Sequence, residues 1–185
     1  MYFVYIFSFL ALIIPLVVIL VLQPKGDENV GQKVGKLLSY AILFPFMFFL
    51  GSKIGLALMG GLSYKGILST VILGILSFKS YYNYYRSKAI WTVIQVQTLE
   101  EVIWAGLAMS FDWFILGIAL SIFLNLHFFF FVGLFLCIFL IILFIREFHL
   151  IKATERWENF FKMSYLVSST FYIFAGLFLM FMIIW

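Results

Sequence analysis

Long apolar stretches alternate with shorter polar ones along the whole chain. Six apolar stretches are long enough to predict membrane-crossing helices, because about 20 helical residues span the roughly 30 Å hydrocarbon core of a bilayer. They are residues 2–22, 37–59, 62–80, 102–124, 126–146 and 163–185. None shows the residue-by-residue alternation of a membrane β-barrel strand. The pattern therefore predicts an all-α polytopic membrane protein with six transmembrane helices.

These helices predict a single membrane domain over residues 1–185. A first three-helix half covers about 1–80 and a second covers about 102–185, with a linker of about 81–101 between them. The stretch "FKSYYNYYRSK" leads into this linker, and tyrosines beside Lys and Arg are typical of an aromatic belt at the headgroup level. We prefer this interpretation to a single-stranded nucleic-acid site, which uses similar residue types.

The distribution of positive charge predicts the orientation. The loops after the first, third and fifth helices carry most basic residues: Lys25, Lys33, Lys36, Arg86, Lys88, Lys152, Arg156 and Lys162, with Lys79 and Arg146 at the loop edges. The opposite side has Lys65, and Lys53 lies in the outer part of the second helix. Cytoplasmic loops are enriched in Lys and Arg. We therefore expect the linker in the cytoplasm and both termini to be extracytoplasmic.

Composition narrows the function classes. The chain is 65% hydrophobic and 11% charged, and its one cysteine, Cys137, cannot form an internal disulfide or a dithiol relay. It contains no phosphate-binding loop, no Cys/His cluster and no nucleophile beside a base, so we expect neither an enzyme nor a bound cofactor. The net charge of +4 resides largely in loops that meet anionic lipid, which makes the bilayer the expected partner rather than nucleic acid.

One carboxylate interrupts the fourth apolar stretch. Asp112 is the only ionisable residue of 102–124, and it lies about ten residues, or roughly 15 Å, from the cytoplasmic end. Acids inside a membrane are rare and usually face the bundle or an aqueous cavity. Asp112 is therefore a candidate ion-binding or proton-coupling group. The alternative is a structural acid that is protonated or paired with Lys53, whose long side chain bridges part of the difference in depth.

Small residues surround this acid along the predicted helix. Gly106 and Ser110 are four residues apart, as are Gly117 and Ser121, and Ala108 lies on the same face as Asp112. Small residues at this spacing let helix backbones approach closely. Ser110 is a second candidate for the ion site, although an ideal helix turns it about 200° from Asp112. It joins that site only if the helix is distorted there.

The stretch "AGLAMSFDWFILGIAL" resembles the fourth-helix motif of the bacterial manganese efflux pump family, part of the LysE-type transporter group. Ser110, Asp112 and Gly117 match that motif in spacing, and "STFYIFAGLFLMFMIIW" is similar to the family's closing helix. The resemblance implies two three-helix halves in inverted orientation. It also implies Mn²⁺ efflux across the bacterial inner membrane, with Asp112 among the groups that bind the metal as cargo.

The first half departs from that family's pattern. Pro15 and Phe44 stand near the places where the resemblance would put two further acids. Two other interpretations therefore stay open. One is a membrane assembly or partner subunit, or a degenerate transporter homologue, that transports nothing and binds another membrane protein or a second copy of itself. The other is a six-helix substrate-binding subunit of a vitamin importer, which we rank lower because such subunits usually keep both termini in the cytoplasm.

Overall fold

The computed structural model describes residues 2–22, 30–59, 64–93, 99–121 and 155–184. Almost all of these residues are helical, and no strand occurs in the described ranges. The helices are α1 (Tyr2–Leu22), α2 (Val30–Met59), α3 (Lys65–Val93), α4 (Leu99–Leu120) and α6 (Glu155–Ile184). This confirms the all-α class. The predicted helix over 126–146, with Cys137, lies outside the described residues.

The helix bounds agree best with the prediction at α1, which occupies the predicted 2–22. Three helices are longer than their apolar stretches. α2 and α6 begin upstream of residues 37 and 163, and α3 continues through Val93. Residues 81–93 were expected in the linker, but no Gly or Pro interrupts the chain after Lys79 to end the helix there. We therefore ended the predicted span at the first polar residues, although the helix continues beyond them.

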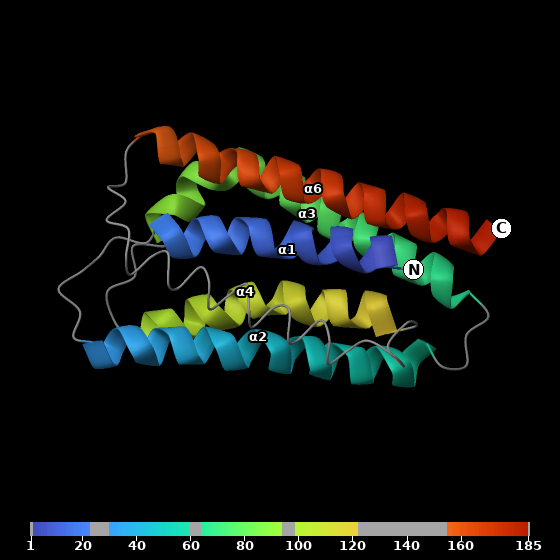
Figure 1. Cartoon of the computed structure of the whole chain (residues 1–185), viewed down its shortest axis with the longest axis horizontal. Helices are drawn as coiled ribbons and strands as arrows, with labels where there is room; N and C mark the ends of the chain where they lie inside the picture. Colours follow the sequence, from blue (N-terminus) through green and yellow to red (C-terminus); the bar gives the residue numbers. More distant parts are fainter. Residues whose placement is uncertain (1, 23–29, 60–63, 94–98, 122–154, 185) are drawn as a thin grey trace.

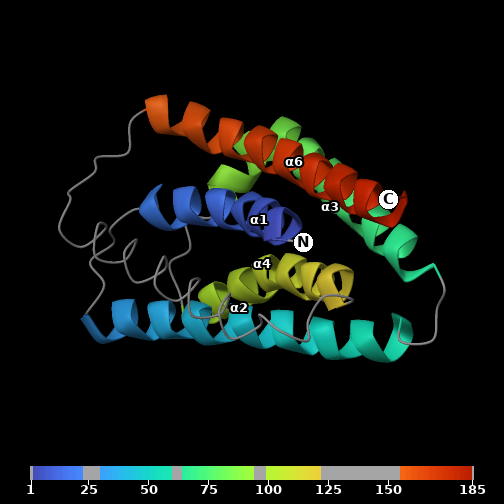
Figure 2. The same ribbon diagram turned by 45° about the vertical axis from the view of Figure 1, so that its right-hand side comes forward.

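The helices form an elongated bundle in which α1 lies between two helix pairs. α3 packs against α6 on one side of α1, and α2 packs against α4 on the other (Figure 1). The same arrangement is visible after rotation (Figure 2). The start of α1 and the end of α6 lie at one end of the bundle (Figure 1). This agrees with termini on a common side, and it leaves open which side that is.

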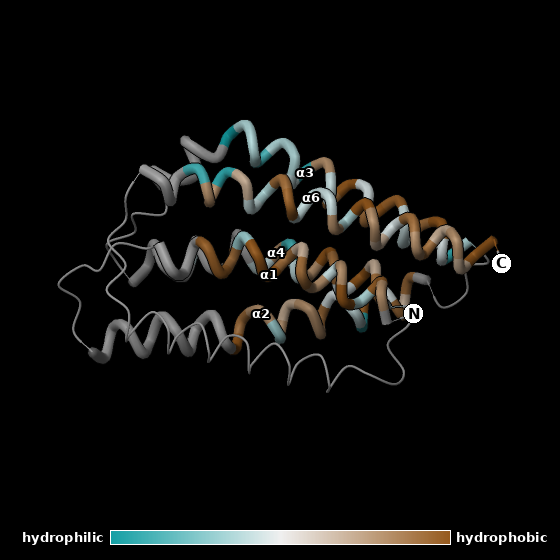
Figure 3. Tube along the Cα trace, turned by 45° about the horizontal axis from the view of Figure 1, so that its top comes forward, coloured by the Kyte–Doolittle hydropathy of each residue, from teal (hydrophilic) through white to brown (hydrophobic). Residues whose placement is uncertain are grey.

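The described helices differ in the length of their apolar segments. Asn159–Ile184 of α6 is the one described segment long and apolar enough to cross a membrane, whereas Phe3–Val18, Ile42–Leu58 and Ser110–Leu120 are shorter apolar helices. Figure 3 shows α3 changing from hydrophobic near the chain termini to hydrophilic at its other end. Length and composition within the described residues therefore identify one candidate span, and the six-span arrangement stays a prediction.

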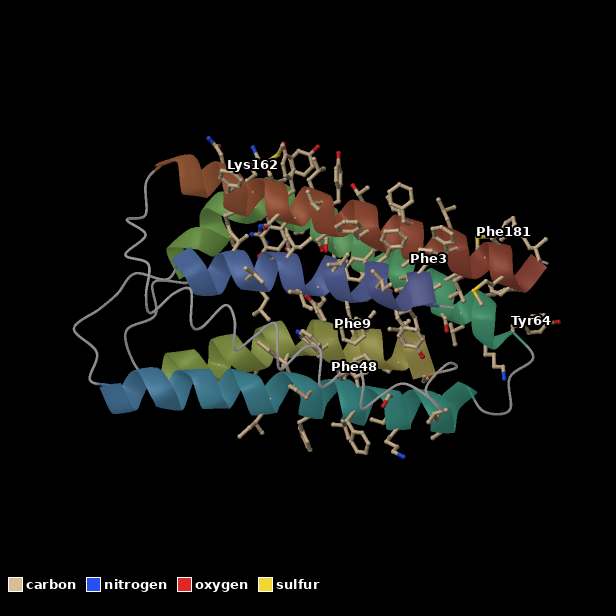
Figure 4. The ribbon with its side chains drawn as sticks, in the orientation of Figure 1. Phe3, Phe9, Phe48, Tyr64, Lys162 and Phe181 are labelled. Atoms are coloured by element: carbon tan, nitrogen blue, oxygen red, sulfur yellow. The ribbon has the colours of Figure 1, made fainter. Side chains whose placement is uncertain are left out.

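An aromatic cluster connects α1, α2 and α4. The Trp113 ring of α4 stacks on Phe44 of α2, with centroids 5.7 Å apart, and meets the edge of Phe9 of α1 at 5.9 Å. Phe9 and Phe48 point toward one another between α1 and α2 at 5.4 Å (Figure 4). All four rings are buried. Offset and edge contacts of this kind favour a single packing arrangement, so the cluster holds the three helices beside Asp112 in register.

Candidate functional site

An ion pair joins α3 to α4. The Lys79 Nζ donates a hydrogen bond to Asp112 Oδ1. The two side chains are partly exposed, 41% for Lys79 and 27% for Asp112. Lys79 follows the apolar first half of α3, and Asp112 lies within the apolar part of α4. Each charge therefore has its counter-charge on a neighbouring helix, while both side chains stay partly accessible.

Lys53 is not the partner of Asp112 in this structure, contrary to the alternative that we drew from the sequence. Its side chain is exposed, and its Nζ lies 5.3 Å from the centroid of the Phe49 ring. Gly51 and Gly55 on the same helix face α4. Lys53 is two residues, or about 200° of helical rotation, from each of them. It consequently lies on the opposite face of α2, away from the ion pair.

Ser110 does not join the ion pair. Its side chain is buried, and its Oγ donates to the Leu107 carbonyl at 2.8 Å, within its own turn of α4. The helix continues through this position, so the ideal rotation that separates Ser110 from Asp112 applies. Ser110 therefore satisfies its hydroxyl locally and contributes nothing to the carboxylate. The surroundings of Gly106 and Ala108 lie outside the side chains that the structure describes.

Gly117 and Ser121, which the sequence suggested as close-packing residues, lie where α4 approaches α2. A Cβ built at Gly117 would collide with the Phe48 carbonyl oxygen and lie 2.9 Å from the Ser52 nitrogen. A Cβ at Gly55 would lie 2.6 Å from Ser121 Oγ. Such an approach brings glycine Cα–H groups toward carbonyl oxygens of the other helix. The two helices thus meet backbone to backbone beside Asp112.

Gly51 completes this contact, and the sequence contained a signal for it that we missed. A Cβ there would overlap the Phe114 carbonyl oxygen. Gly51 and Gly55 form a G-x-x-x-G motif, "GSKIG", which faces the G-x-x-x-S spacing of Gly117 and Ser121. Small residues at this spacing on two apolar helices predict their association.

The positions that the resemblance assigns to further acids are apolar in this structure. Phe44 is fully buried and stacked on Trp113, and Pro15 is buried within α1. Neither place can supply a carboxylate to a metal. Among the residues that the structure describes, no group of three or more His, Cys, Asp and Glu lies together. Mn²⁺ prefers several hard oxygen ligands, and the described neighbour of Asp112 is instead an ammonium group.

Pro15 has a structural consequence for the neighbouring helix. Proline has no N–H, so the carbonyl four residues earlier, that of Ala11, loses its helical donor. Ser168 Oγ of α6 donates to this Ala11 oxygen instead. Side-chain hydroxyls of adjacent helices commonly satisfy carbonyls that a proline leaves free within an apolar bundle. The bond therefore joins α1 to α6 at the place where α1 lacks a backbone hydrogen bond.

Serine hydroxyls also join α3 to α6. Ser77 Oγ donates to the Ser169 carbonyl at 3.1 Å, and the two hydroxyl oxygens lie 3.0 Å apart. Ser80 Oγ and Ser168 Oγ lie 3.2 Å apart. Because the Ser168 hydrogen is directed to Ala11, Ser80 supplies the hydrogen of that contact. These two serine contacts connect α3 to α6 on either side of Lys79 in the chain, and Ser168 extends the second contact to α1.

Three further polar side chains lie near the level of the ion pair. Tyr165 and Tyr172 of α6 are buried and close enough to Asp112 to interact with it electrostatically. Ser8 of α1 is fully buried, and its Oγ has no hydrogen-bond partner within the described part of the chain. Unsatisfied buried hydroxyls are uncommon and call for an explanation.

The ring contacts place Ser8 near the level of Asp112. The Phe7 ring lies 5.6 Å from that of Phe171, which precedes Tyr172, and the Phe9 ring lies 5.9 Å from that of Trp113, which follows Asp112. Ser8 stands between those two phenylalanines in α1. Ser8 therefore lies in the part of α1 that packs between Phe171 of α6 and Trp113 of α4, the neighbours of Tyr172 and Asp112 in the chain.

The sequence interpretation missed Lys79 as the partner because the residue stood at the edge of the predicted third helix, where it counted as a loop charge. Its place directly after the apolar run "ILSTVILGILSF" was the available signal. The helix continues beyond it for fourteen residues to Val93, so Lys79 belongs to α3 and not to a loop.

Comparison with protein-family models, curated proteins and solved structures found no match to this chain.

Proposed function

We propose that this chain is a transporter-like integral membrane protein in which Asp112 is a mid-membrane carboxylate that binds a cation or a proton. The proposed architecture has six membrane-spanning helices, two three-helix halves and extracytoplasmic termini, in a bacterial inner membrane. The observation that carries the proposal is the Lys79–Asp112 pair, held between two otherwise apolar helix segments and yet partly accessible.

An ion pair is an expensive way to join two helices. The cost of removing two charges from water often exceeds their attraction, and apolar pairs of similar volume frequently give equal or greater stability. Ionisable side chains within membrane helices are rare for this reason, and they commonly mark ion or proton pathways. The pair is therefore better explained by a role in ion binding than by cohesion alone.

The surface of the described helices favours a lipid environment. Large apolar side chains project outward from α3 and α6, including Ile67, Ile75, Phe78, Leu177, Phe181 and Ile184. Soluble monomers rarely expose apolar surface on this scale over contiguous helices. On α3 these side chains precede Lys79, and beyond it the exposed residues are Tyr81, Tyr82, Tyr85 and Arg86. The described exposed surface of α3 therefore becomes more polar after Lys79.

A growth experiment tests the cargo that the resemblance implies. A bacterium lacking its manganese exporter is complemented with the wild-type chain, with Asp112→Asn, or with Lys53→Gln as a matched change of a charge outside the site. We expect wild type and Lys53→Gln to protect against Mn²⁺ and Asp112→Asn to fail. If wild type gives no protection, manganese efflux is wrong. If Asp112→Asn protects as well as wild type at equal expression, the role of Asp112 is wrong.

The second candidate is an assembly subunit in which the same ion pair only joins α3 to α4. It is favoured by the direct Lys79–Asp112 contact, which occupies Oδ1 of the carboxylate with an ammonium group. Purification in mild detergent separates the two possibilities. A stoichiometric membrane partner, together with the absence of ion flux in liposomes, would support the assembly subunit. Ion flux that depends on Asp112 would support the transporter.

A further inference from the structure

We propose that Lys79 is a tethered counter-cation that occupies Asp112 when no cargo is bound, and that a singly charged alkali cation such as Na⁺ displaces it. This inference rests on the proposed function and adds the class of cargo and the way in which the empty site is closed. It begins from the contact between Lys79 Nζ and Asp112 Oδ1.

The charge balance of the pair points to a singly charged ligand. One ammonium and one carboxylate sum to zero, and exchanging the ammonium for Na⁺ at the carboxylate leaves its local charge neutral. A divalent cation would leave one uncompensated positive charge, which is costly where the surrounding dielectric is low. The site is therefore balanced for one positive charge.

Oxygen atoms near the pair favour an alkali cation over a bare proton. Tyr165 and Tyr172 lie within electrostatic range of Asp112, and the Ser8 hydroxyl is buried at a similar level without a described partner. Na⁺ is a hard cation that binds carboxylate, hydroxyl and carbonyl oxygens. A proton on Asp112 would need none of these groups. The unpartnered Ser8 hydroxyl is the second, independent indication that a ligand belongs at this level.

The released ammonium has a polar direction in which to move. Lys79 follows the apolar run "ILSTVILGILSF", and α3 changes from hydrophobic to hydrophilic along its length (Figure 3). Ser80 follows it, and exposed Tyr81 and Tyr82 come next. A lysine side chain has a flexible four-carbon stem, which lets its charge swing toward a wetter region while the helix stays in place. Displacement therefore requires a rotamer change of Lys79 and no unfolding of α3.

The tethered cation also explains how the protein could switch the access of its site between the two sides of the membrane when no cargo is bound. A lone carboxylate in hydrocarbon is strongly unfavourable. Lys79 neutralises the Asp112 carboxylate after the cargo leaves, so the empty protein can return to its starting conformation without an isolated charge. The same attraction competes with cargo. Removing Lys79 should therefore tighten cargo binding and slow the return step, whereas a merely structural pair would lose stability and gain no affinity.

Binding of ²²Na⁺ to the purified full chain in lipid nanodiscs tests this competition. We expect Lys79→Gln to bind at least about tenfold more tightly than wild type, given the strength of a charge pair in a medium of reduced dielectric constant. Lys79→Arg should bind more weakly, since guanidinium pairs with carboxylates through two parallel hydrogen bonds. Asp112→Asn should not bind. Lys53→Gln, the matched removal of a charge on the outer face of α2, should bind like wild type.

A second measurement uses the unmodified chain and avoids variants that fail to fold. Reductive methylation of lysines is followed by mass spectrometry in NaCl and in choline chloride at equal ionic strength. We expect Na⁺ to increase the methylation rate of Lys79 severalfold, because displacement frees its Nζ, and to leave Lys53 unchanged. Equal rates for Lys79 in both salts would overturn the proposal, as would Lys79→Gln binding no more tightly than wild type.

These outcomes separate the two levels of interpretation. If Asp112-dependent transport is found but the cargo is Mn²⁺ and Na⁺ does not bind, the inference fails and the proposed function stands. If Asp112→Asn transports as well as wild type, the proposed function fails, and the inference fails with it.

Discussion

The hydroxyl of Ser168 on α6 donates a hydrogen bond to the carbonyl oxygen of Ala11 on α1, four residues before Pro15. The proline creates the free acceptor and the serine satisfies it, although 157 residues separate serine and acceptor along the chain. The same serine receives a hydrogen bond from Ser80, the neighbour of Lys79. The backbone defect in α1 is thereby connected to the helix that carries the counter-charge of Asp112.

Ser168→Ala should destabilise the protein by about 1 kcal/mol, the usual net value of one buried hydrogen bond. In a Pro15→Ala background the same change should cost clearly less, because the N–H of residue 15 would then satisfy Ala11. The measurement is a double-mutant cycle of unfolding free energies in mixed micelles. Equal costs in both backgrounds would show that the serine does not compensate the proline.

Gly117→Ala should weaken the α2–α4 contact by about 1–3 kcal/mol, the typical cost of overpacking, because its Cβ meets backbone atoms of Phe48 and Ser52. Gly74→Ala is the matched control, since a Cβ there has no neighbour within 4 Å. The control should be neutral or slightly stabilising, as alanine favours helix over glycine. Thermal unfolding of both variants in one detergent decides; a loss at Gly74 equal to that at Gly117 would contradict the contact.

Phe44→Ala should cost about 3–5 kcal/mol, the range for deleting a buried aromatic side chain. Phe44 is fully buried against Trp113, whereas Phe46 on the same helix is 57% exposed. Phe46→Ala should change the stability by less than about 0.5 kcal/mol. Because Trp113 stacks on Phe44, its fluorescence should change in the first variant, with the other tryptophans replaced by phenylalanine, and not in the second. Similar effects from both variants would contradict the aromatic cluster.

Replacing both members of the ion pair should separate stability from function. Asp112→Leu alone leaves the Lys79 charge unpaired and should cost about 1–3 kcal/mol, below the value for fully buried pairs because both side chains are partly exposed. Adding Lys79→Met should restore most of that loss. Neither variant should transport. Transport by the stable double variant would show that the pair is only structural.

The predicted orientation can be checked by labelling single cysteines in intact cells, after Cys137→Ser removes the native thiol. Tyr64→Cys, at the turn between α2 and α3, and Arg86→Cys occupy exposed positions among the described residues. A membrane-impermeant maleimide should label position 64 from outside and position 86 only after the cells are broken. The opposite pattern would place both termini in the cytoplasm and favour the vitamin-importer interpretation.

Much of the local structure was predictable from the order of the residues. A continuous apolar run of adequate length forms helix, because a backbone without water must satisfy its own polar groups, and α1 agrees with its predicted range for this reason. The small residues at Gly117 and Ser121 also predicted close packing, since their spacing places them on one face. The end of α3 was mispredicted because we placed it where the side chains become polar. A helix continues as long as its backbone hydrogen bonds do, and the polar stretch "KSYYNYYRSK" therefore lies within α3.

The sequence by itself determined that Asp112 lies within an apolar helix and needs compensation. Only the tertiary structure decided the compensating group: Lys53 and Lys79 are both lysines near the ends of apolar runs, and helix rotation turns Lys53 to the outer face while α3 brings Lys79 to the carboxylate. The partner of the Ala11 carbonyl was equally beyond local reasoning. Pairing across helices depends on their rotation and register, which arise when many side chains pack together, as the rings of Phe9, Phe44 and Trp113 do here.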